Sequence, residues 1–138
     1  MATDTSGYIK AMIEWASGDL RQVYLRVTAA LSIAVLFVTQ IPLKDLQELD
    51  RWPTRAFFIG LGCLVLAAGM YFFYVDRTHR ARREMACLLK PSAGRGDPYD
   101  ILAKTYKRWK WALWLGNVAF PFGVGLLAYV LYALIAQH

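Results

Sequence analysis

The feature that most constrains this chain is its division into long uncharged stretches separated by short charged ones. Residues 27–43, 56–75 and 111–136 contain no Asp, Glu, Lys or Arg, so all 16 basic and all ten acidic residues lie outside them. A bilayer imposes this segregation, because about 20 predominantly apolar residues are needed to cross its hydrocarbon core. The sequence therefore predicts an all-α integral membrane protein with three transmembrane helices.

The three predicted spans differ in character. The first, 27–43, is short and ends at Pro42, and a short external loop, 44–55, follows it. The second, 56–75, is the most regular, and its aromatic run 71–74 stands where an interfacial aromatic belt is expected. The third, 111–136, is entered through a group of tryptophans, which also favour the membrane interface.

The N-terminal segment 1–26 has the pattern of an amphipathic helix. Seven of its residues recur at the spacing of one helical face: Ile9, Met12, Ile13, Ala16, Leu20, Val23 and Tyr24. Residues 17–19, Ser-Gly-Asp, are a possible break in this helix. We expect a cytoplasmic or interfacial helix that lies on the membrane surface or packs on the protein itself, and the sequence leaves both arrangements open.

The orientation follows from the distribution of Lys and Arg across the loops. Residues 76–110 contain ten of them, whereas the loop 44–55 contains three. The positive-inside rule therefore places 76–110 in the cytoplasm, as a helical hairpin that extends the second and third spans and contains a Pro/Gly linker at 91–98. Asp97 and Pro98 predict the start of the second helix of the hairpin. We expect a cytoplasmic N-terminus and an external C-terminus, in the inner membrane of a bacterium.

Small residues form a stripe on each of the last two predicted spans. They recur at spacings of four, three and four, as Ala56, Gly60, Cys63 and Ala67 on one span and Ala112, Gly116, Ala119 and Gly123 on the other. Such stripes let helix backbones approach closely in lipid. We favour packing of the two spans on each other within one chain, and an interface between subunits is the alternative.

Asn117 and Pro121 stand four residues apart in the third span. Proline leaves the carbonyl of Asn117 without its helical partner, which predicts a kink near the middle of the membrane. The functional interpretation is a hinge or a pore constriction. We favour a static kink whose amide bonds Thr28, Ser32 or Thr39 of the first span, because lipid cannot satisfy such polar groups.

A basic face is predicted on the cytoplasmic helices. It comprises Arg77, Arg80, Arg82, Arg83, Lys104, Lys107, Arg108 and Lys110. Anionic headgroups attract such residues, so we interpret the face first as a membrane anchor and determinant of topology. Tryptophans stand beside the basic residues 104–110, which also suits nucleic-acid binding. Tryptophans are typical interfacial anchors, however, and no nucleic acid is expected.

No residue pattern predicts catalysis. The predicted spans carry no ionisable residue, which disfavours a proton relay, an ion site or haem ligation within the bilayer. Cys63 and Cys87 are far apart, and neither forms a zinc motif with His. We therefore expect that the protein binds no metal or cofactor and is not an enzyme. The hypothesis is a non-catalytic helix-packing subunit of a homo-oligomer or larger membrane complex, and the alternative is a pore-forming or membrane-disrupting effector, as in bacterial defence, gated through its cytoplasmic segments.

Overall fold

The computed structural model describes residues 2–89 and 97–137, and side chains from residue 6 onward. Three helices, α1 (Ala2–Gln40), α3 (Arg51–Cys87) and α4 (Pro98–Ala136), are long and apolar enough to cross a membrane, and α2 (Leu43–Glu48) is short. The described residues contain no β-strand. The predicted all-α class and the number of candidate spans are therefore confirmed.

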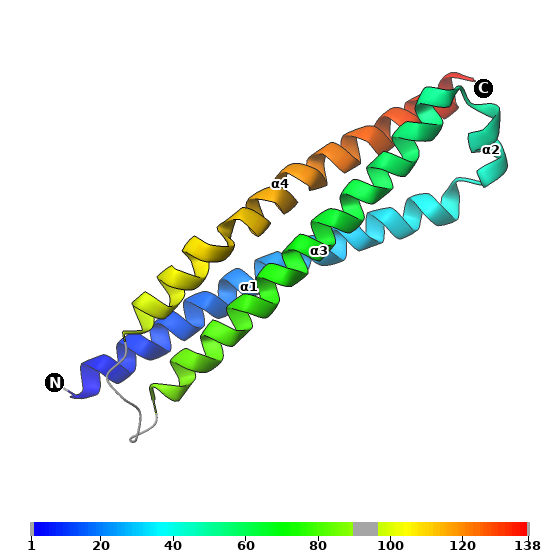
Figure 1. The fold of residues 1–138 in the computed structure, drawn as a ribbon. Helices are drawn as coiled ribbons and strands as arrows, with labels where there is room; N and C mark the ends of the chain where they lie inside the picture. The colour runs from blue at the N-terminus through cyan, green and yellow to red at the C-terminus, as the bar shows by residue number, and fades with distance from the viewer. Residues whose placement is uncertain (1, 90–96, 138) are drawn as a thin grey trace.

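The three long helices run side by side, each antiparallel to the next in the chain (Figure 1). Helix α3 packs on both others, whereas α1 and α4 contact each other only sparsely. The start of α1, the end of α3 and the start of α4 lie together at one end, which we call the basic end. Helix α2 and the end of α4 lie at the opposite end.

The N-terminal segment is not a separate helix but the first part of α1. The expected break at residues 17–19 is wrong, because the helix continues through it. Ser17 Oγ donates to the carbonyl oxygen of Ile13 at 2.8 Å, so this side chain is satisfied inside the helix. Buried Ala16, Leu20 and Val23 pack this part of α1 inward, which offsets the weak helix propensity of Gly18. Of the two arrangements left open, the structure has the segment packed on the protein.

The connection between α1 and α3 is shorter than the predicted loop 44–55. Helix α1 ends at Gln40, two residues before Pro42, and α3 already begins at Arg51. Pro53 therefore lies in the first turn of α3, where a backbone N–H would have no acceptor within the helix, so its absence costs no helical hydrogen bond. The connection is held by buried Leu46, whose carbonyl oxygen accepts a 2.8 Å hydrogen bond from Thr54 Oγ1.

Helix α4 begins where the sequence predicts. Asp97 is the N-cap, and its Oδ1 accepts a hydrogen bond from the backbone N–H of Tyr99 at 2.9 Å. Most of the predicted linker 91–98 lies outside the described residues, which resume at Asp97. Farther along, α4 passes through Pro121 as one continuous helix, so a mid-membrane kink stays a prediction.

The interior contains two apolar clusters along α3. The cluster toward the opposite end includes Leu64, Leu127 and Val130, which are fully buried. The cluster toward the basic end includes two tyrosines, Tyr71 and Tyr74, that are almost completely buried. The predicted aromatic belt is thus divided, because helical periodicity turns these two rings inward while Phe72 stays exposed.

Candidate functional site: the groove between α1 and α4

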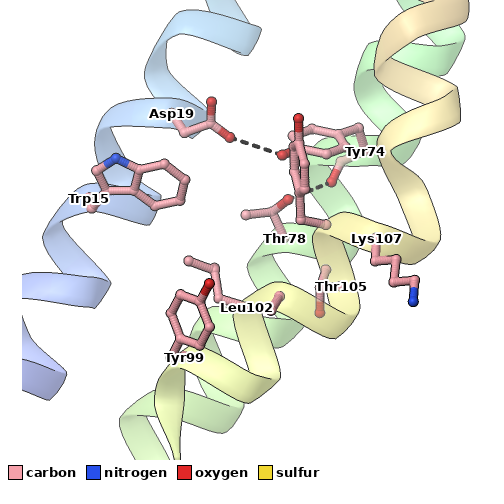
Figure 2. Close-up of a pocket in the computed structure, with 10 residues that line it drawn as sticks. Trp15, Asp19, Tyr74, Thr78, Tyr99, Leu102, Thr105 and Lys107 are labelled. Atoms are coloured by element: carbon pink, nitrogen blue, oxygen red, sulfur yellow. Dashed lines mark hydrogen bonds between the residues drawn. The ribbon is translucent and has the colours of Figure 1, made fainter.

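The sparse contact between α1 and α4 leaves a groove between them, with α3 as its floor. At the basic end the groove widens to a cavity of about 370 Å³. Figure 2 shows Trp15 of α1 and Tyr99 of α4 on either side of it, with Tyr74 and Thr78 of α3 between. The lining is mainly apolar and aromatic, so this part of the groove suits an apolar side chain or an acyl chain.

The polar groups at this end of the groove bond to one another. Tyr74 Oη donates to Asp19 Oδ2 at 3.1 Å, and Thr78 Oγ1 donates to the Tyr74 carbonyl oxygen at 2.9 Å (Figure 2). Asp19 therefore ties α1 to α3. These bonds hold the floor and one wall of the cavity together.

A second polar cluster bridges α1 and α4 farther from the basic end, where Arg26, Tyr71 and Asn117 of three different helices meet. Asn117 Oδ1 accepts a hydrogen bond from Arg26 Nη1 at 2.8 Å and another from Tyr71 Oη at 2.8 Å. The expected partners of Asn117 are wrong. Thr28 Oγ1 and Thr39 Oγ1 instead donate to carbonyl oxygens of their own helix, because those acceptors lie one turn away.

This cluster lies inside the uncharged part of the bundle. Asn117 is seven residues beyond Lys110, the last charged residue of α4, and Tyr71 is five residues before Asp76. At ~1.5 Å per residue, the guanidinium group of Arg26 lies about 7–10 Å inside the uncharged stretches of α3 and α4. By sequence position Arg26 precedes the first span, yet its charge reaches the depth of the second and third.

The Arg26–Tyr71–Asn117 cluster has more hydrogen-bond donors than acceptors. Asn117 Oδ1 already accepts two bonds, whereas the amide NH₂ of Asn117 and the other N–H groups of Arg26 have no acceptor among the described residues. Arg26 and Asn117 are both exposed. The cluster therefore presents donors, in a region otherwise built of apolar side chains, to whatever covers the groove.

The two small-residue stripes pack α3 on α4. Gly60 and Gly123 approach so closely that a Cβ on Gly123 would lie 2.9 Å from the carbonyl oxygen of Gly60. A Cβ on Gly116 would lie 2.7 Å from Cε1 of the buried Tyr71 ring. All eight stripe residues are buried except Cys63, which is half-buried. The contact lies within one chain, which is the arrangement favoured from the sequence, so the stripes do not supply a surface for a partner.

The predicted basic face is divided among several environments. Arg77 and Arg108 both stack near Trp109, whereas Arg80 forms a 3.3 Å ion pair with Asp76. Lys107 lines the groove. The remaining members do not join this group: Arg82 and Arg83 line a separate hollow with His79, and Lys104 and Lys110 are exposed.

Sequence reasoning missed the residues that define the groove. The sequence pattern places Arg26 outside the predicted spans, and it predicts Tyr71 as part of an aromatic belt because four aromatic residues stand together. A usable signal was present in α1, since Trp15, Asp19 and Arg26 recur at spacings of four and seven and so share one helical face. Among the described residues, no group of three or more His, Cys, Asp or Glu side chains could hold a metal ion.

No family model, curated protein or solved structure matches this chain.

Proposed function

We propose that this chain is a non-catalytic membrane protein that acts as a subunit of a homo-oligomer or larger membrane assembly, with the α1–α4 groove as its docking surface. Helices α1, α3 and α4 cross the bilayer in this proposal, with the basic end in the cytoplasm and the C-terminus outside. The positive-inside rule supports this orientation, and the inner membrane of a bacterium is the proposed setting.

The observation that carries the proposal is the exposed Arg26–Asn117 pair. Both side chains lie at a depth where the other helices are uncharged, and both are exposed in the single chain. Hydrocarbon offers no hydrogen-bond acceptor, so a polar cluster at this depth normally faces protein or water. A further helix seated in the groove would cover it and would also cover the aromatic rim at Trp15 and Tyr99.

The unbalanced cluster defines the chemistry of the docking helix. That helix must present acceptor oxygens, because the free groups of Arg26 and Asn117 are donors. The outer face of α1 carries exposed Thr28, Ser32 and Thr39. Thr28 is only two residues, about 3 Å, along the axis from Arg26, so the depths match.

These hydroxyls and the groove lie on different faces of one chain, so they can meet only between two copies. We therefore propose that α1 of one copy packs along the groove of the next, over the Arg26–Asn117 bridge. A hydroxyl that donates within its own helix still has lone pairs with which to accept. A contact of this head-to-tail kind closes into a ring if its rotation allows.

Native mass spectrometry after extraction in mild detergent tests the proposal, because it reports stoichiometry and partners together. The wild-type chain should appear as an oligomer or with partner chains. Asn117→Leu should release monomers, because leucine keeps the volume but removes the amide. Phe122→Leu is the matched control, since Phe122 is exposed on the same helix and makes no polar contact. A clean wild-type monomer, or equal behaviour of the two variants, would contradict the proposal.

A pore-forming effector is the second candidate, and the same donor cluster favours it. In a ring whose grooves face the central axis instead of a neighbouring copy, Arg26 and Asn117 would line a pore that is otherwise apolar. Purified oligomer in liposomes should then release a trapped dye, and Asn117→Leu should change the rate. A confirmed oligomer that causes no leakage would exclude the pore and leave the subunit proposal standing.

A further inference from the structure

A second hollow opens between α3 and α4 at the basic end, with a volume of about 330 Å³. Three guanidinium groups line it, from Arg77, Arg80 and Arg108, together with Trp109. One carboxylate, Glu84, also lines it. Basic groups therefore outnumber acidic ones around this hollow, whereas the mainly apolar α1–α4 cavity is lined by one of each, Asp19 and Lys107.

Aromatic rings hold two of these arginines in place. The guanidinium carbon of Arg77 lies 4.9 Å from the centre of the Trp109 ring, and that of Arg108 lies 5.2 Å from it. Arg77 also lies 5.1 Å from the centre of Phe73, which packs edge-on against Trp109 at 4.9 Å. Stacking of this kind restricts a side chain that would otherwise have many rotamers, so the two charges are preorganised.

Among the described residues, neither Arg77 nor Arg108 forms an ion pair, whereas Arg80 pairs with Asp76. Arg77 Nε is buried without a hydrogen-bond acceptor. Two fixed, unneutralised guanidinium groups around one ring are a site for an anion, and a phosphate matches their planar forks.

The depth of the hollow indicates where this phosphate comes from. Arg77 stands two residues beyond the uncharged stretch 56–75, and Arg108 stands three residues before the stretch 111–136. The hollow therefore lies at headgroup level if the helices cross a bilayer. The ring of Trp111 lies 6.4 Å from Phe73 and 6.5 Å from Trp109, so these three rings offer an apolar surface next to the hollow on the membrane side.

We propose that this hollow binds the phosphate of one anionic phospholipid from the cytoplasmic leaflet, with the acyl chains along the aromatic surface below it. Arg77 and Arg108 contact the phosphate, and Trp109 positions them. The proposal rests on the membrane insertion and orientation proposed above but not on the docking of a second copy. It is also more specific than a general attraction of the basic face to anionic lipids, because it assigns the affinity to two of the eight basic-face residues.

Lipid titration followed by native mass spectrometry tests this assignment. Purified protein in a neutral detergent should retain one phosphatidylglycerol in preference to phosphatidylcholine with the same chains. Arg77→Gln combined with Arg108→Gln should raise the dissociation constant for phosphatidylglycerol by about tenfold or more, as expected when charge-assisted hydrogen bonds are lost. Arg108→Gln alone should show most of this loss, and its exposed position keeps the fold intact.

The matched control is Arg82→Gln combined with Arg83→Gln, which removes the same number of charges, both from α3 and both outside the hollow. Its dissociation constant should stay within about twofold of wild type, because diffuse surface charge is not what binds the lipid. Equal losses in the two double variants would overturn the proposal, as would unchanged affinity in Arg108→Gln. Displacement of the lipid by inorganic phosphate would assign the site to a soluble anion instead.

The same spectra separate this proposal from the docking proposal. Asn117→Leu should change the stoichiometry and leave the bound lipid in place. Arg108→Gln should remove the lipid from each copy whatever the stoichiometry.

Discussion

Replacing Gly123 by alanine should weaken the packing of α3 on α4, because the added Cβ would lie 2.9 Å from the carbonyl oxygen of Gly60. Ordinary van der Waals contact for a Cβ begins at 3.4 Å. The clashing atom belongs to the backbone and cannot rotate away, so the two helices must part by about 0.5 Å. A gap of that size already forfeits about a quarter of the dispersion energy of each atom pair along the seam.

The expected loss follows from two opposing effects. Overpacking a tight interior site costs about 1–3 kcal/mol, and alanine in a helix gains about 0.5–1 kcal/mol over glycine. The net change in the free energy of unfolding for Gly123→Ala is therefore a loss of up to about 2.5 kcal/mol. Gly125→Ala is the matched control, since nothing lies within 4 Å of its new Cβ. It should stabilise the protein by up to about 1 kcal/mol.

Steric trapping in mild detergent measures these free energies of unfolding without heat or strong denaturant. The informative quantity is the difference between the two variants, about 1–3 kcal/mol, because both gain the helix propensity of alanine and only Gly123→Ala adds the overpacking cost. Gly62→Ala on α3, also without neighbours within 4 Å, should behave like Gly125→Ala. If Gly123→Ala were as stable as Gly125→Ala, the close seam between α3 and α4 would be refuted.

Two further predictions concern the helix start and the orientation. Asp97→Ala should lower the free energy of unfolding by about 1 kcal/mol and speed amide hydrogen exchange at Tyr99, because the Tyr99 N–H loses its 2.9 Å hydrogen bond to the cap. Asp97→Asn keeps an acceptor oxygen and should have neither effect. Equal exchange rates at Tyr99 in the two variants would contradict the cap. Cys87, an exposed free thiol at the end of α3, should resist impermeant thiol reagents in intact cells and react after permeabilisation when Cys63 is replaced by alanine. Labelling of Cys87 in intact cells would reverse the proposed orientation.

The packing of α3 on α4 could be predicted from the sequence because its cause is local. A stripe of small residues follows from helical periodicity alone, and Ala112, Gly116, Ala119 and Gly123 are all buried as that periodicity requires. The start of α4 at Asp97–Pro98 was predictable for the same reason, since a cap needs only residues adjacent in the chain. The continuity of α1 was not, because burial of Ala16 and Leu20 on other helices overrides the local break signal at residues 17–19.

The groove could not be predicted from any single segment, because it depends on how the three long helices are placed relative to one another. Whether Arg26 lies outside or inside the uncharged zone depends on how α1 is shifted along its axis relative to α3 and α4. That shift places its guanidinium group at Asn117, which is 91 residues away in the chain. The axial register of α3 against α4 brings Tyr71 onto Asn117, and an expected interfacial ring is instead buried.

The division of the chain into uncharged and charged stretches determined, by itself, an all-helical fold with three candidate spans. That much follows from composition, because an apolar stretch of this length can satisfy its backbone in hydrocarbon only by forming a helix. The tertiary structure decided which polar side chains meet. It placed Arg26, Tyr71 and Asn117 in one cluster and stacked Arg77 and Arg108 against Trp109. Both outcomes depend on the axial register and rotation of packed helices, which interlocking side chains set between segments and not within them.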